Sequence, residues 1–185
     1  MPFRSADFAT LTEAHDYAAQ GDTGSNFYTG RGDIYASITY RELRLQAIEL
    51  AHKLMGLGLT KGDRVALVAE TNPEFIRFFY ACQYAGLIPV ALPASVKVGA
   101  HCAYVAQLKQ LLEASDAEIG MASEGYLSFL QEASEGLSMR MVDAPEAFHA
   151  LPADVQPLHQ AEPDDISYIQ YTSGSTRFPR GVVIK

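Results

Sequence analysis

Residues 64–92 of this chain, RVALVAETNPEFIRFFYACQYAGLIPVAL, decide its fold class. The run Arg64–Val68 is apolar after its first residue, as in parallel strands that are buried on both faces. Asn72-Pro73 predicts a helix start, because the amide caps the first turn and proline at the first helical position loses no hydrogen bond. Gly86 ends that helix, and Leu87–Leu92 follows as a second strand. A strand, a crossover helix and a second strand predict an α/β fold.

The same alternation continues toward the C-terminus. We expect, in chain order, a helix at His101–Ala114, a strand at Glu118–Ala122, a helix at Gly125–Ala133 and strands at Met139–Val142, Ile166–Tyr171 and Val182–Ile184. Residues 152–163 contain three prolines and little periodicity, so we expect a loop there. The sequence therefore predicts a mostly parallel sheet flanked by helices, with right-handed crossovers.

A helix, a hairpin and a further helix are expected before that unit. The first helix and the two strands of the hairpin fall at Thr10–Gln20, Asn26–Thr29 and Ile34–Ile38. Arg31-Gly32-Asp33, between the strands, spells an integrin-recognition tripeptide, but its glycine favours a plain turn. Thr39 and Glu42 then form a capping box that starts the next helix. The apolar face of that helix consists of Leu43, Ala47, Leu50, Ala51 and Leu54.

Composition excludes several classes of function. The chain has 185 residues, 48% of them hydrophobic, which is enough to bury a core. A net charge of −8 argues against nucleic-acid and anionic-lipid partners. The apolar stretches are shorter than the ~20 residues of a membrane span, and residues 1–7 lead into no apolar secretory region. We therefore expect a cytoplasmic protein without a membrane span, with Cys82 and Cys102 as buried free thiols.

A loop rich in hydrogen-bond donors follows the strand at Ile166–Tyr171. It reads TSGSTRFPRG over residues 172–181. Ligands of open α/β sheets bind beyond the carboxyl ends of strands, where this loop is expected. Its hydroxyls, its backbone N–H groups near glycine and its two guanidinium groups suit a polyphosphate. The Gly-Lys-Ser/Thr ending of a Walker A loop is absent, and from composition alone a plain polar loop remains an alternative.

Residues 171–182, YTSGSTRFPRGV, resemble the phosphate-binding signature of the AMP-forming acyl and aryl ligases. That superfamily includes the acyl-CoA synthetases, firefly luciferase and the adenylation domains of peptide synthetases. Three upstream stretches, Ile38–Leu43, Gly62–Leu67 and Gly86–Val90, resemble the same superfamily. The similarity extends from about Tyr35 to the end of the chain.

Two positions depart from the common form of the signature. Arg177 stands where glycine is usual, and Arg180 stands where lysine is usual. The sequence Ser175-Thr176-Arg177, together with Val90–Pro93, resembles the fatty acyl-AMP ligases, which generally pass the acyl group to an acyl carrier protein instead of coenzyme A. This resemblance implies an enzyme that activates a fatty acid.

The implied chemistry has two steps, in which a carboxylate attacks the α-phosphate of ATP, pyrophosphate leaves, and a thiol then takes the acyl group. Hydroxyl and amide donors along the leaving pyrophosphate would lower the barrier. The resemblance assigns phosphate binding to Thr172, Ser173, Gly174, Ser175, Thr176, Arg177, Arg180 and Gly181. Arg180 would clamp the outer phosphates, and Gly174 and Gly181 would give the loop backbone freedom. Mg²⁺ is implied with ATP, and its main ligand is expected beyond Lys185.

Residues 1–185 are expected to form the N-terminal part of one adenylation domain, without the rest of the large domain and the C-terminal domain. The last strand ends at Lys185 with no helix behind it, which we interpret as truncation. Two alternatives remain open. The first is an acyl-CoA synthetase or another carboxylate-adenylating enzyme, and the second is a stand-alone nucleotide-binding or interaction module without catalysis.

Some residues have a simpler interpretation than a site. The aromatic residues Phe75, Phe78, Phe79, Tyr80 and Tyr84 could line an acyl tunnel, but their helical spacing favours core packing. Asp164-Asp165 could bind a metal, but an acidic pair before a buried strand is more often a solvated loop end. The five histidines are too scattered for a metal site and are expected at the surface or with satisfied hydrogen bonds. Neither Ser173 nor Ser175 has an evident base for nucleophilic catalysis.

Overall fold

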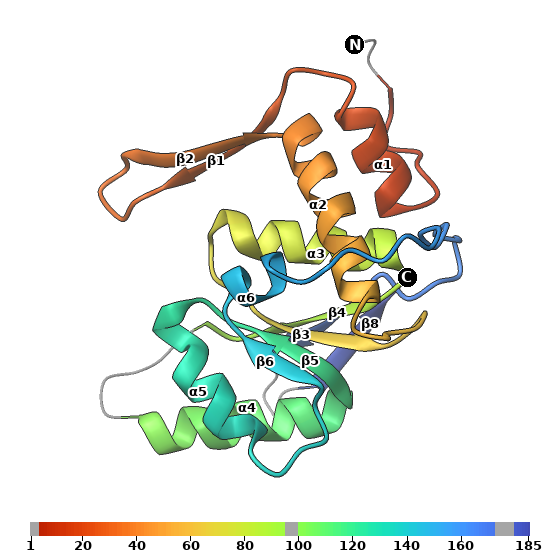
Figure 1. The fold of residues 1–185 in the computed structure, drawn as a ribbon. Coiled ribbons are helices and arrows are strands. Elements are labelled where there is room, and N and C mark those ends of the chain that lie inside the picture. The colour runs from red at the N-terminus through yellow and green to blue at the C-terminus, as the bar shows by residue number, and fades with distance from the viewer. Residues whose placement is uncertain (1–3, 95–99, 173–179) are drawn as a thin grey trace.

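The computed structural model describes residues 4–94, 100–172 and 180–185. A layered α/β body carries a projecting two-stranded arm (Figure 1). In chain order the elements are α1 (Leu11–Ala18), β1 (Gly24–Tyr28), β2 (Ile34–Thr39), α2 (Tyr40–Met55), β3 (Arg64–Val68), α3 (Pro73–Ala85), β4 (Ile88–Leu92), α4 (His101–Ser115), β5 (Ala117–Met121), α5 (Glu124–Ser134), β6 (Met141–Asp143), α6 (Pro145–His149), β7 (Tyr168–Thr172) and β8 (Arg180–Ile184).

The body is a six-stranded sheet between two layers of helices. Its strand order is β6-β5-β3-β4-β7-β8, and every neighbouring pair is parallel except β7 and β8. Helices α2, α3 and α6 cover one face, whereas α4 and α5 cover the other (Figure 1). The predicted α/β fold with a mostly parallel sheet is confirmed.

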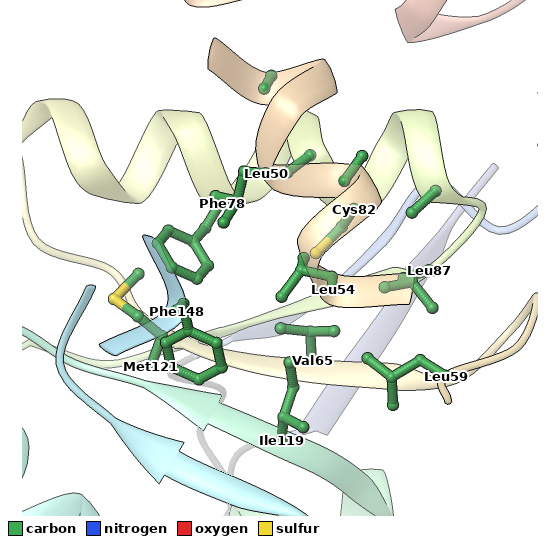
Figure 2. Packing of buried hydrophobic residues seen from close by; sticks show 14 of the residues in the cluster. Leu50, Leu54, Leu59, Val65, Phe78, Cys82, Leu87, Ile119, Met121 and Phe148 are labelled. Carbon is green, nitrogen blue, oxygen red and sulfur yellow. The ribbon is translucent and has the colours of Figure 1, made fainter. Parts of the chain in front are cut away.

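The larger core lies between α2, α3 and the sheet. Leu50 and Leu54 of α2 and Phe78 of α3 are directed at the sheet, where Val65 and Ile119 meet them (Figure 2). Burying one such leucine stabilises the fold by roughly 1.5–3 kcal/mol, whereas the helix propensities of ordinary residues differ by only about 1 kcal/mol or less. Packing of the apolar face therefore holds α2 on the sheet.

The predicted helix signals form as expected. Thr39 accepts a hydrogen bond from the Glu42 N–H, and the Glu42 carboxylate accepts one from the Thr39 N–H, which completes the capping box. Asn72 caps α3 by accepting from the Phe75 N–H, and Gly86 ends that helix in the left-handed region at φ 70°. These bonds satisfy backbone groups that a helix end leaves without partners.

Three features differ from the sequence predictions. Helix α6 was not expected, because five residues are too few for a periodic pattern, and its burial of Phe148 holds it in place. Strand β8 runs back antiparallel beside β7, so residues 168–184 form a hairpin. Cys82 is buried as predicted, but the prediction for Cys102 is wrong: it is exposed in the first turn of α4.

Within the described ranges, no helix combines the length and the apolar character that a membrane crossing requires.

A buried polar cluster joins α1 to α2 and α3. His15 is only 2% exposed, and its ring lies 4.0 Å from the ring of Tyr80. The Tyr84 hydroxyl donates to Asp16 Oδ1 at 2.7 Å, so His15 Nδ1, 3.2 Å from that hydroxyl, must be the donor of the second bond. Asp16 also pairs with Arg44 at 2.6 Å. His15 Nε2 has no hydrogen-bond partner of normal geometry among the described residues, but the Tyr40 backbone bonds the ring and raises its pKa, which opposes the effect of burial.

This cluster predicts a loss of stability in mild acid. Burial lowers the pKa of His15 from 6.5 to about 4, because a charged imidazole would lose its hydration. Below pH 6.5 the unfolded chain takes up a proton that the folded chain takes up only near pH 4, so stability falls across that window. The free energy of unfolding should drop by about 2 kcal/mol between pH 7.5 and 5.0 through this residue. Urea unfolding of the parent and of His15→Phe at both pH values measures it. Equal pH dependence in the two proteins would contradict the assignment.

Candidate functional site

The predicted phosphate loop connects the two strands of the β7–β8 hairpin. Thr172 ends β7, Arg180 begins β8, and the two are cross-strand partners. The Thr172 hydroxyl lies 3.5 Å from the carbonyl oxygen of Arg180. The hairpin therefore fixes both ends of the loop. Ser173, Gly174, Ser175, Thr176 and Arg177 lie outside the described residues, so the contacts predicted for them stay predictions.

The loop starts at the carboxyl edge of the parallel strands. Strand β7 pairs in parallel with β4, which pairs with β3, so the ends of all three strands reach the same edge. A cleft of ≈ 240 Å³ lies there between the sheet and α4. It is lined by Ala69 after β3; Ala91, Leu92 and Pro93 at the end of β4; Gln107 and Leu111 of α4; and Gln170, Tyr171 and Thr172 of β7. This is the place where ligands of open α/β sheets bind.

Thr172 and Arg180 are available to a ligand at this edge. Both residues are exposed, and Arg180 forms no ion pair with any residue in the described part of the chain. A guanidinium group offers two parallel donors to a phosphate, and a hydroxyl adds a third. The pair can thus bind an anion at the mouth of the loop.

The backbone freedom predicted for Gly181 is not what its conformation requires, and its assignment to phosphate binding stays a prediction. Its φ lies outside the left-handed region, so backbone freedom does not explain the glycine. A Cβ at this position would lie 3.2 Å from Tyr171 Cε1 and 3.4 Å from Ile169 Cγ2. Gly181 pairs with Tyr171 across the hairpin, and the missing side chain leaves space for the tyrosine ring.

Replacing Gly181 with valine should therefore displace Tyr171. The two extra methyl groups beyond the Cβ have no room beside the ring, and we expect the free energy of unfolding to fall by about 1–3 kcal/mol. In a Tyr171→Ala background the same replacement should cost less than half of that, because the ring is gone. Urea unfolding of the four proteins of this cycle measures the coupling. Additive effects would show that the ring does not require the glycine.

Three tyrosines on the α4 side hold the backbone around the cleft, a role that no sequence pattern predicted. The Tyr171 hydroxyl donates to the carbonyl of Leu111 at 3.2 Å. Tyr104 donates to Pro93 at 2.6 Å, and Tyr126 donates to Ala94 at 2.7 Å. Burial raises the pKa of Tyr104 and Tyr171, which keeps both phenols protonated as donors. The sequence signal was a phenol among the apolar residues of α4, α5 and β7, since such a hydroxyl needs a partner when it is buried.

The other candidate residues lie away from this edge. The aromatic residues of α3 pack in the α2–α3 core, on the sheet face opposite the cleft, as the core-packing interpretation predicted. Two of them, Phe78 and Tyr84, are buried, and the other three, Phe75, Phe79 and Tyr80, are partly buried. Asp165 pairs with Lys61 at 2.7 Å and with His159 at 2.9 Å, and these contacts lower its pKa. It anchors the loop before β7 beside a cavity of ≈ 360 Å³ at the amino-terminal edge of the sheet, opposite the edge where β7 ends.

The described residues offer no group of three or more histidine, cysteine, aspartate or glutamate side chains that could hold a metal ion.

Comparison with known proteins decides the family. The sequence model described as AMP-binding enzyme matches residues 15–185. The chain belongs to this family. A Caulobacter vibrioides protein named "Putative acyl-CoA synthetase" is 41% identical over 98% of this chain and 32% of its own length. The long-chain-fatty-acid–AMP ligase of Mycolicibacterium smegmatis is 30% identical over 86% of this chain and 25% of its own length.

Solved structures agree with this family assignment. One from a study of fatty acyl-adenylate ligases of E. coli and L. pneumophila is 42% identical, with a TM-score of 0.92 over 99% of this chain and 33% of that one. Another, a fatty acyl-adenylate ligase of L. pneumophila with acyl adenylate and pyrophosphate, is 22% identical with a TM-score of 0.75, and this likeness concerns the fold alone. The chain thus spans about a third of the length of its relatives.

Proposed function

We propose that residues 1–185 form the N-terminal part of the adenylation domain of a fatty acyl-AMP ligase. In this function, ATP and a fatty acid give acyl-adenylate and pyrophosphate, and an acyl carrier protein then takes the acyl group. The observation that carries the proposal is the hairpin in which Thr172 and Arg180 are cross-strand partners, because these two residues flank the signature loop and Thr172 ends β7 at the carboxyl edge that β7 shares with β4. Membership of the AMP-binding family supports adenylate chemistry as the reaction.

Six residues of the loop would act on the leaving pyrophosphate. Negative charge builds on the bridging oxygen between the α- and β-phosphates as that bond breaks. Arg180 holds the outer phosphates with its planar fork, and Thr172 donates at the start of the loop. Ser173, Ser175 and Thr176 contribute hydroxyl or amide donors, and Gly174 lets the backbone approach. The Tyr171 hydroxyl bonds the end of β7, where this loop starts, to α4. Tyr104 and Tyr126 bond the two residues that follow β4.

The test requires a polypeptide of the relatives' length. We define the extended enzyme as residues 1–185 continued by the part of the Caulobacter relative that lies beyond the match. We expect it to convert ATP and a fatty acid into AMP and pyrophosphate, measured by nucleotide chromatography against the unaltered Caulobacter relative. Formation of ADP and phosphate would contradict the proposal.

The acceptor of the acyl group distinguishes the proposal from its nearest competitor. Several relatives carry names of CoA ligases, which favours an acyl-CoA synthetase, whereas the 42% identical structure comes from work on fatty acyl-adenylate ligases. Offered coenzyme A and a carrier protein together, the extended enzyme should load mainly the carrier protein. Mass spectrometry of both acceptors measures this. If acyl-CoA were the main product, the chain would be assigned to the acyl-CoA synthetases. Tight binding of ATP without formation of acyl-adenylate would favour a binding module.

A further inference from the structure

The side chain of Tyr171 connects the base of the signature loop to helix α4. We define the neck of the loop as its two nearest cross-strand pairs, Tyr171 with Gly181 and Thr172 with Arg180. The Tyr171 ring lies in the space that the missing side chain of Gly181 leaves. The Tyr171 hydroxyl donates to the Leu111 carbonyl of α4 at 3.2 Å, and the residue packs against the core that α4 and α5 form. One side chain thus contacts both strands of the neck and the helix layer beside them.

Tyr171 and Arg180 lie on opposite faces of the hairpin. Side chains alternate between the two faces of a sheet along each strand, and directly opposed cross-strand partners share a face. Tyr171 packs on the α4 side. Thr172, the next residue, and its partner Arg180 therefore point to the other face. The phenol does not reach a phosphate that Arg180 binds, so any influence of Tyr171 on the reaction has to pass through the backbone of the neck.

We propose that Tyr171 is a positioning residue for acyl-adenylate formation, because its hydrogen bond to α4 fixes the backbone of the neck and thereby orients the Arg180 guanidinium toward the leaving pyrophosphate. This inference rests on the proposed function. In the step concerned, a carboxylate oxygen of the fatty acid bonds to the α-phosphorus of ATP. The bond from that phosphorus to the oxygen of the β-phosphate breaks, and its electron pair leaves with pyrophosphate. A donor stabilises this developing charge most when it is held in place beforehand.

The surroundings of the Tyr171 hydroxyl make phenylalanine a specific replacement. The Leu111 carbonyl also accepts a hydrogen bond from the Ser115 hydroxyl at 2.8 Å, so it keeps a partner when the phenol hydroxyl is removed. An acceptor that keeps a partner avoids the desolvation cost of an unsatisfied buried group. The ring beside Gly181 stays in Tyr171→Phe. The variant therefore loses the hydrogen bond to α4 while the packing of the neck remains.

Single-turnover adenylation by the extended enzyme tests the proposal. The enzyme, in excess over ATP and with saturating fatty acid, is mixed rapidly, and acyl-adenylate is measured against time over a series of enzyme concentrations. The plateau of the rate constant reports the folded, ATP-bound enzyme, whereas ATP affinity and the folded fraction change the enzyme concentration at half of the plateau. Because a misplacement of about 1 Å can cost roughly 10²-fold, we expect the loss of this one hydrogen bond to lower the plateau about tenfold in Tyr171→Phe. A merely structural role would move only the half-plateau concentration.

Tyr84→Phe is the matched control. The Tyr84 hydroxyl also donates a hydrogen bond, to Asp16 at 2.7 Å, but this tyrosine lies in the α2–α3 core on the other face of the sheet. Its removal should leave the plateau at the parent's value. In an Arg180→Ala background, Tyr171→Phe should lower the plateau less than about threefold, because the group that it positions is gone. A parental plateau in Tyr171→Phe, an equal loss in Tyr84→Phe, or an undiminished loss in the Arg180→Ala background would overturn the proposal.

Hydrogen–deuterium exchange of the extended enzyme gives a second measurement that does not depend on catalysis. Tyr171→Phe should speed the exchange of the β7 and β8 amides, because the hairpin loses a hydrogen bond to the body, while β3 at the centre of the sheet should exchange as in the parent. Unchanged exchange in β7 and β8 would overturn the positioning role. An extended enzyme that forms no acyl-adenylate would instead refute the proposed function, and the exchange rates would still decide whether Tyr171 holds the neck.

Discussion

Replacing Arg180 with alanine should lower the rate of acyl-adenylate formation in the extended enzyme by about 10²–10³-fold, which corresponds to roughly 3–4 kcal/mol of lost transition-state stabilisation. The guanidinium group is exposed at the start of β8, opposite Thr172, and is free of ion pairs within the described ranges. Pyrophosphate release at varied ATP and fixed fatty acid measures the effect. The apparent affinity for the fatty acid should change little, because Arg180 meets phosphates and not the alkyl chain.

Two further variants make this prediction specific. Arg180→Lys should recover part of the lost rate, because the positive charge survives although the two-pronged geometry is lost. Arg31→Ala, which removes an exposed arginine at the tip of the distant arm, should leave the rate within twofold of the parent's. An Arg180→Ala rate within twofold of the parent's would exclude the phosphate-clamp role.

Residues 1–185 alone should release no pyrophosphate above the blank when they are offered ATP and a panel of fatty acids. Thr172 and Arg180 are exposed, and the adjacent cleft of ≈ 240 Å³ is smaller than common small-molecule sites. A site that does not enclose both substrates cannot hold the carboxylate against the α-phosphate, and such positioning accounts for about 7–11 kcal/mol of many barriers. The extended enzyme, assayed beside it at equal concentration, is the positive control. Clear turnover by the 185-residue chain would refute the proposal that it is only part of the catalytic domain.

The sequence predicted those features of the fold that depend on neighbouring residues. Thr39 and Glu42 contact each other within one helical turn, and so do Asn72 and Phe75, so the two helix starts could be predicted from spacing alone. The buried run of β3 was equally clear, because four apolar residues follow each other in a segment too short for a helix. The position of the loop after β7 followed from strand order in α/β folds.

Features that depend on distant residues could not be predicted in this way. Tyr171 bonds a carbonyl 60 positions earlier, and nothing near it in the sequence indicates Leu111. Gly181 was interpreted as a source of backbone freedom, but its neighbour across the hairpin explains it, and that neighbour became known only with the antiparallel pairing of β8. The buried His15 of α1 is similar, because it contacts Tyr40 of α2 and Tyr80 and Tyr84 of α3. Pairing direction and long-range contacts are properties of the packed chain.

Transfer of ¹⁸O from the fatty acid carboxylate to AMP tests the central claim most directly. If the carboxylate attacks the α-phosphate, one oxygen of the labelled carboxylate bridges the two groups in the acyl-adenylate and stays with AMP when an acceptor thiol takes the acyl group. The extended enzyme, given ATP, doubly labelled fatty acid and a carrier protein, should therefore yield AMP with one ¹⁸O and unlabelled pyrophosphate by mass spectrometry. Label in inorganic phosphate, or AMP without label, would contradict an AMP-forming ligase.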